Sequence, residues 1–188
     1  PSWNGAPAPP RPTSSPTACS SETSWAWETA KVRPCRASSD SAETGASGTD
    51  TNWSTAGNWN GGVPTGADDV KFFDAGTNGV AGAPNNLVDG AFAGPIGSLQ
   101  YGNTNGFHTT VIAPGQTLTV NGGLSVFTPA DPGVARTLSE TITGLDGTLT
   151  LNNTSSNLVL NQGNGTAGGS RSILDMSGLG NCNATLSR

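Results

Sequence analysis

"QTLTVNGG" at residues 116–123 and "GTLTLNNT" at residues 147–154 repeat one short pattern, T-L-T followed by Val or Leu and then Asn, 31 residues apart. A third, looser version, "NLVLN", occupies residues 157–161. Small residues and Asn at the bends suit stacked coils, in which the inward Leu, Val and Ile of one coil are buried by its neighbours. The repeat predicts a β-solenoid. Because the period is imperfect, a β-sandwich is the alternative.

The rest of the chain after residue 50 has the same character. Gly, Asn, Thr and Ser rank low in helix propensity, and the chain contains 27 Gly and 13 Pro with only 11% charged residues. Short runs rich in β-branched and apolar residues alternate with turn signals such as "GNTNG", "APG", "NGG" and "GLDG". The runs are "DDVKFFD", "NNLVDGAF", "IGSLQYG", "HTTVIA", "QTLTVNGGLSVFT", "ARTLSETITG", "GTLTLNN", "SNLVLNQG" and "SILDMSG". We therefore predict an all-β fold.

The composition changes sharply before this region. Residues 1–50 contain three of the five Trp, two of the three Cys and Pro-rich stretches such as "APAPPRPTSSP", without a sustained period of two or 3.6. We interpret residues 1–50 as a Pro/Ser-rich disordered tail or linker. The same mixture of residues is also typical of GC-rich DNA translated in a wrong frame, so this segment has a second interpretation as non-native coding sequence. Residues 51–188 are predicted to form the cap and first coils of the solenoid.

The stretch "TNWSTAGNWNGGVPTGADDVKFFD" at residues 51–74 opens the β region. Together with "NNLVDG", "IGSLQYGN", "QTLTVNGGL" and "GTLTLNNTSSNLVL", it resembles the amino-terminal part of the autotransporter-associated β-strand repeat proteins. These are large secreted or surface proteins of Gram-negative-type bacteria, and some end in a sorting signal of the PEP-CTERM kind. The most specific part of the resemblance is the opening carried by Asn52, Trp53, Ser54, Asn58, Trp59, Gly62, Val63, Pro64 and Asp68.

The resemblance implies a right-handed parallel β-helix that forms an extracellular stalk or passenger segment at the bacterial cell surface or outside the cell. It brings no catalytic residues with it. This sequence lacks the signal peptide, the long repeat array and the carboxy-terminal anchor of such proteins, so we expect a fragment whose further repeats lie downstream of Arg188. The expected function is structural or adhesive.

Trp53 and Trp59 have two interpretations. Their rings could stack on sugars, with Asn52 and Asn58 as hydrogen-bonding neighbours, which would make the opening a carbohydrate-binding module and extracellular polysaccharide its partner. Alternatively, the pair covers the open end of the first coil, as repeat folds require. We favour the cap, because the motif lies at the start of the β region.

Charge excludes some partners. The net charge of −5 comes without a basic cluster dense enough for a run of phosphates, so we expect no nucleic acid partner. No apolar run approaches the length of a membrane span, and we expect this segment to make no membrane contact. Asp68, Asp69 and Asp74 cluster in a way that would suit calcium, but the sequence has no EF-hand loop and no repeated calcium-binding nonapeptide. We predict no cofactor, with calcium as the alternative.

Catalysis has weak support in the sequence. His108 is the only histidine, in "NGFHTT", and we expect an exposed residue at the start of a strand. The remaining enzyme hypothesis is a β-helix polysaccharide-degrading enzyme, which would use a basic residue near an anionic glycan. After residue 50 only four Lys and Arg oppose eight Asp and Glu, which would repel such a substrate. We therefore predict a protein that is not an enzyme.

Overall fold

The computed structural model of the chain describes residues 40–42, 50–104, 106–128, 136–162 and 171–187. Contacts divide the chain into two units, Pro1–Ala37 and Ser38–Arg188, and all described residues belong to the second unit. Most of the predicted tail at residues 1–50 therefore lies outside the described residues. The described part contains strands and one short 3-10 helix, Ala56–Asn58, which confirms the all-β prediction.

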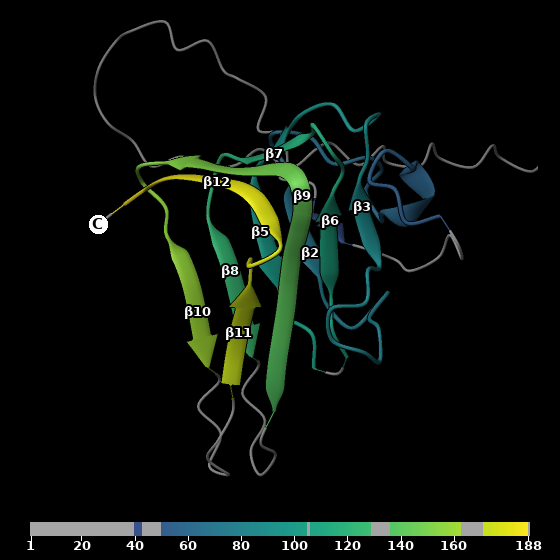
Figure 1. Cartoon of the computed structure of the whole chain (residues 1–188), viewed down its shortest axis with the longest axis vertical. Helices are drawn as coiled ribbons and strands as arrows, with labels where there is room; N and C mark the ends of the chain where they lie inside the picture. The colour runs from purple at the N-terminus through teal and green to yellow at the C-terminus, as the bar shows by residue number, and fades with distance from the viewer. Residues whose placement is uncertain (1–39, 43–49, 105, 129–135, 163–170, 188) are drawn as a thin grey trace, which may run out of the picture. The chain divides into compact units, whose positions relative to one another are not determined.

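The strands form a parallel β-solenoid in which each coil contributes to three ladders (Figure 1). The first ladder contains β1 (Asp40–Ala42), β2 (Asp69–Phe72), β5 (Ser98–Tyr101), β8 (Leu124–Thr128) and β10 (Leu158–Gln162). The second contains β3 (Asn86–Val88), β6 (Thr109–Ile112), the first part of β9 (Thr137–Asn153) and β11 (Arg171–Asp175). The third contains β4 (Pro95–Ile96), β7 (Thr117–Val120), the second part of β9 and β12 (Leu179–Leu186). All of these pairings are parallel, which confirms the solenoid over the sandwich.

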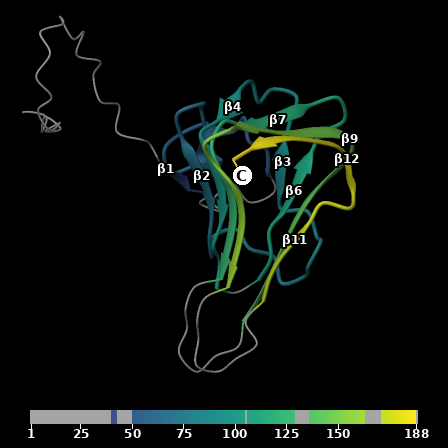
Figure 2. The ribbon, with the colours of Figure 1, turned by 90° about the vertical axis from the view of Figure 1, so that its left-hand side faces the viewer.

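Each coil runs through the three ladders in order. The first coil is β2, β3 and β4, the second is β5, β6 and β7, the third is β8 and β9, and the fourth is β10, β11 and β12. In Figure 2 the ladder of β2 lies at the left, β7 and β12 cross the top, and β6 and β11 lie on the right-hand side. Because every second residue of a strand points inward, apolar side chains of successive coils stack in the interior.

The repeated T-L-T pattern is stacked in register, as the sequence predicts. Leu118 of β7 pairs with Leu149 of β9, and Val120 pairs with Leu151. All four side chains are at most 1% exposed. The looser copy "NLVLN" behaves differently, because its strand β10 pairs with β8 in the first ladder rather than with β9 in the third. The strand stacked on "GTLTLNN" is instead β12, with the sequence "LGNCNATL".

Strand β9 is long because it turns a corner of the solenoid without interruption. The corner lies at Gly144, whose φ of +145° places it in a region that other residues rarely adopt. A Cβ on Gly144 would overlap the carbonyl oxygen of Ile112 in the coil below, and one on Gly147 would lie 2.7 Å from the same atom. Glycine at these positions lets adjacent coils approach closely while the chain changes direction.

The start of the solenoid is covered by residues that precede the first coil. A parallel bridge joins Asn52 to Leu87, with Trp53 N–H donating to the Leu87 carbonyl at 2.8 Å and Leu87 N–H donating to the Thr51 carbonyl at 2.9 Å. β1 pairs with the outer edge of β2. This short strand lies inside the predicted tail at residues 1–50, so the solenoid begins earlier than the predicted boundary. "DSA" has no strand pattern of its own, and the free edge of β2 explains its conformation.

The opposite end of the described solenoid has no such cover. In the part of the chain that the structure describes, no strand pairs with the outer edges of β10, β11 and β12. Leu160, which stacks on Val126 in the interior ladder, is 47% exposed at this end, whereas Val126 is fully buried. Apolar side chains and strand edges are therefore both open here.

Candidate functional site

Trp53 and Trp59 lie inside the molecule. Trp53 is fully buried and Trp59 is 5% exposed. The two rings meet edge to face at 5.2 Å, and Trp53 also contacts Phe72 and Phe92. Both indole N–H groups are satisfied internally, since Trp53 donates to Asn86 Oδ1 at 3.0 Å and Trp59 donates to the Trp53 carbonyl at 2.9 Å. These contacts place the pair over the interior of the first coil.

The neighbouring asparagines also serve the local fold. The Asn58 side chain donates to the Asn52 carbonyl at 2.8 Å and is itself buried. Asn52 provides the backbone bridge to Leu87. A carbohydrate platform at Trp53 and Trp59 needs an exposed ring face, and the structure offers none. The burial is the opposite of what sugar stacking requires, because the indoles fill the space above Phe72.

His108 is buried, so the prediction of an exposed residue is wrong. It does lie directly before strand β6, as expected. Its Nδ1 faces the amide nitrogen of Asn85 at 3.1 Å, and its Nε2 lies 2.6 Å from the Phe73 carbonyl. An amide nitrogen can only donate and a carbonyl can only accept, so the neutral tautomer with the proton on Nε2 fits both contacts. Desolvation by burial lowers the pKa of His108 to about 4, although the Phe73 carbonyl opposes this shift.

Glu140 is the residue that the sequence analysis missed. It lies in the first part of β9 with no exposed surface, between His108 in the coil below and Leu174 in the coil above. Its Oε2 accepts the backbone N–H of His108 at 2.7 Å, and Oε1 has no hydrogen-bond partner among the described residues. Desolvation by burial raises the pKa of Glu140 to about 8, against the opposing effects of His108 and Asn103. Burial therefore favours the protonated, neutral form of the carboxyl at pH 7.

A hydrogen-bonded chain connects this carboxyl to the tryptophans. Trp53 donates to Asn86, Asn86 donates to Asn85, and Asn85 contacts His108. The backbone of His108 then donates to Glu140. We call this set the corner network: Trp53, Asn85, Asn86, His108 and Glu140. It joins three successive coils on one side of the interior, and its burial leaves no side chain open to a substrate.

The acidic residues considered for calcium all accept hydrogen bonds from neighbouring hydroxyl or backbone groups. Asp68 Oδ2 accepts from the backbone and hydroxyl of Thr65, each at 2.7 Å. Asp69 accepts from the Ser98 hydroxyl, and Asp74 accepts from the backbone and hydroxyl of Thr104. Among the described residues, no group of three or more His, Cys, Asp and Glu gathers in a way that could hold a metal ion. Asp68 therefore stabilises a local turn, whereas Asp69 and Asp74 each link the first coil to the second.

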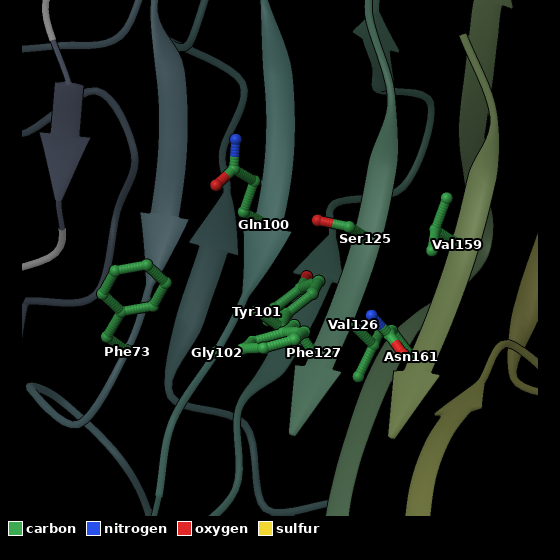
Figure 3. A pocket seen from close by; sticks show the side chains of 9 residues that line it. All are labelled: Phe73, Gln100, Tyr101, Gly102, Ser125, Val126, Phe127, Val159 and Asn161. Carbon is green, nitrogen blue, oxygen red and sulfur yellow. The ribbon is translucent and has the colours of Figure 1, made fainter. Parts of the chain in front are cut away.

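A surface hollow of about 460 Å³ lies on the outer face of the first ladder (Figure 3). Phe73 follows β2 on one side, Gln100 and Gly102 lie in and after β5, and Phe127 lies on β8. The hollow is lined by Phe73, Gln100, Tyr101, Gly102, Ser125, Val126, Phe127, Val159 and Asn161. We call it the outer groove. No residue in it was a candidate in the sequence analysis.

Comparison with known proteins identifies no relative of this chain. No protein-family model, curated protein or solved structure matches this chain. The parts of the chain described by the structure also contain no helix long and apolar enough to cross a membrane. The fold and the geometry of the described residues are therefore the basis for a function.

Proposed function

We propose that this chain is a non-catalytic structural or adhesive segment of a protein exported to the bacterial cell surface. The observation behind the proposal is the stack of parallel coils, closed at its start by the buried Trp53 and Trp59 and held in register by interior ladders. Such a stack grows by adding coils and presents long flat faces, which suits a stalk or passenger. The resemblance of residues 51–188 to autotransporter-associated β-strand repeat proteins supports the same function.

The buried polar residues support the non-catalytic part of the proposal. His108 and Glu140 are the described groups with the largest pKa shifts, and strongly shifted groups are often candidates for catalysis. Here both are fully buried in the corner network, where a substrate cannot reach them. Their shifts follow from desolvation inside a packed coil stack.

Surface labelling tests the proposed location. An antibody raised against residues 51–188 should label intact cells of the source organism as strongly as permeabilised cells, because an exported segment is accessible from outside. Flow cytometry measures both populations, with an antibody against a cytosolic protein as the control for cell integrity. Labelling that requires permeabilisation would contradict the proposal.

The open end of the fourth coil predicts that the chain self-associates. Unpaired strand edges and exposed apolar side chains such as Leu160 favour contact with another molecule. In sedimentation velocity, the weight-average mass should rise with protein concentration. Leu160→Lys should shift the chain towards monomer, because a charge at this end opposes edge pairing.

Val80→Lys provides the matched control, because Val80 is 66% exposed and lies between the first and second strands of the first coil. It adds the same charge away from the open end and should leave the association unchanged. A wild-type chain that stays monomeric at every concentration would contradict this prediction, because it would show that the strand edges at this end already have partners.

A further inference from the structure

The outer groove collects the exposed aromatic surface of the described chain. The described residues include eight Trp, Tyr and Phe: Trp53, Trp59, Phe72, Phe73, Phe92, Tyr101, Phe107 and Phe127. Of these, only Phe73 and Phe127 are exposed, at 45% and 44%, and both line the outer groove. All the others are buried or half-buried. The two exposed aromatic rings of the described residues therefore lie in the same groove.

The rings lie beside polar side chains in a fixed arrangement. Gln100 pairs in register with Ser125, and Ser125 pairs with Val159, so one row of side chains crosses three adjacent strands. Phe127 pairs with Asn161 in the row below. The Phe73 ring packs over the backbone of Gly102, where a Cβ would lie only 2.7 Å from its Cε1 atom. Figure 3 shows the rings, the amides and the hydroxyl together along the groove.

The chemistry of the lining selects the ligand. None of the nine lining residues is charged. Aromatic faces offer packing for an apolar ring surface, while the Gln100 and Asn161 amides and the Ser125 hydroxyl offer donors and acceptors. A ligand with apolar C–H faces and hydroxyl groups on its rim matches both kinds of contact. We infer that the outer groove binds a neutral polysaccharide, which lies across the strands of the first ladder.

The position of the groove disfavours other polymers. A peptide that adds to a sheet needs a free strand edge, but β5 pairs with β2 and β8 on its two sides, and β8 pairs with β5 and β10. Only side chains are therefore available at the centre of the groove. A nucleic acid needs Lys or Arg for its phosphates, and none lines the groove of this chain with its net charge of −5. This inference goes beyond the proposed function and does not depend on the cellular location of the protein.

Native affinity electrophoresis tests the inference. The full chain is run through gels that contain a soluble neutral glucan, mannan or xylan, and in parallel through gels with a uronate polymer. We expect retardation by at least one neutral glycan and a loss of affinity of about tenfold or more in the Phe73→Ala, Phe127→Ala double variant, because stacking surfaces dominate such contacts. Since the ligand is neutral, raising NaCl from about 50 to about 500 mM should leave the affinity unchanged.

Two further variants separate the groove from general effects. Gly102→Ala should weaken binding while the aromatic rings remain, because the added methyl displaces the Phe73 ring. Val80→Ala, at an exposed apolar position outside the groove lining, should bind like the wild type. Circular dichroism confirms that each variant is folded. No retardation by any neutral glycan, undiminished binding by the folded double variant, or salt-sensitive binding of the uronate polymer alone would each overturn the inference.

Discussion

Trp53→Ala should destabilise the solenoid more than any exposed substitution. Trp53 is fully buried against Trp59, Phe72 and Phe92. Replacing a buried Trp by Ala typically costs about 3–5 kcal/mol of the free energy of unfolding, because apolar contacts are lost and a cavity remains. The change also removes the N–H that satisfies Asn86 Oδ1 inside the molecule. Small domains have free energies of unfolding of about 5–15 kcal/mol, so this one residue accounts for a large fraction of the total stability.

Urea unfolding followed by far-UV circular dichroism measures this loss without relying on tryptophan fluorescence. Trp53→Phe separates the two contributions, since it keeps an aromatic ring but removes the N–H. We expect it to lose less stability than Trp53→Ala. Leu145→Ala is the surface control, because Leu145 is 84% exposed at the corner of β9. A loss below about 1 kcal/mol for Trp53→Ala, within the range of ordinary surface changes, would contradict the assignment of Trp53 as a cap.

Glu140→Gln should change how stability depends on pH. In the folded protein the pKa of Glu140 is raised from 4.5 to about 8, so unfolding between these values releases a proton. Rising pH therefore favours the unfolded state by about 1.4 kcal/mol per pH unit in this window. Gln has the same shape and no proton to release, and it can still accept the His108 N–H. The variant should gain stability relative to the wild type as pH rises from 4.5 to 8.

His108 has the opposite effect on the pH dependence of stability. The two residues together determine how the unfolding free energy of the wild type changes with pH. Its pKa falls from 6.5 to about 4 on folding, so unfolding takes up a proton in that window and acid favours the unfolded state. Between pH 4.5 and 6.5 the proton released by Glu140 matches the one taken up by His108, and their contributions cancel. Above pH 6.5 only the Glu140 contribution remains, and stability should fall.

Chemical unfolding at a series of pH values gives both profiles. In the difference in unfolding free energy between Glu140→Gln and the wild type, the contributions of all other titrating groups cancel, because the two proteins share those groups. We expect that difference to rise steadily from pH 4.5 towards pH 8. A flat difference would mean that Glu140 is ionised in the folded protein and that its burial is compensated in another way.

The interior ladders could be predicted from sequence because their signal is local and repeated. Alternation in "QTLTV" and "GTLTL" identifies the inward residues, and their common spacing identifies the stacking partner. The strand β12 gave a weaker signal. "NCNATL" alternates, but the positions in register with Leu149 and Leu151 are Cys182 and Ala184, and the T-L-T pattern is not repeated. Its conformation comes from the free edge of β9 rather than from its own propensity. The sequence did not assign a partner to "NLVLN", and its strand β10 pairs with β8 rather than with the two closer copies of the repeat.

The polar interior was harder to predict. Alternation does place Glu140 on the inward face with Leu138 and Ile142, and this was the available signal. It was outweighed by the general rule that acidic residues are exposed. The burial of His108 depends on Asn85 and on the Phe73 carbonyl, which lie 23 and 35 residues away in the sequence. Likewise, the outer groove forms from four successive coils, and no single stretch of sequence contains it.

The direction of the ladders has a mechanical consequence. The hydrogen bonds between β2, β5, β8 and β10 run along the stacking direction, and the strands lie across it. Tension along the stack therefore pulls neighbouring coils apart. The interface between the terminal coil and the next one breaks first, and the other interfaces follow in sequence. A coil with the 31-residue spacing of β7 and β9 frees about 100 Å of chain when it detaches. A stack of coils built this way lengthens in steps under a sudden load, and the coils that stay stacked keep their folded structure.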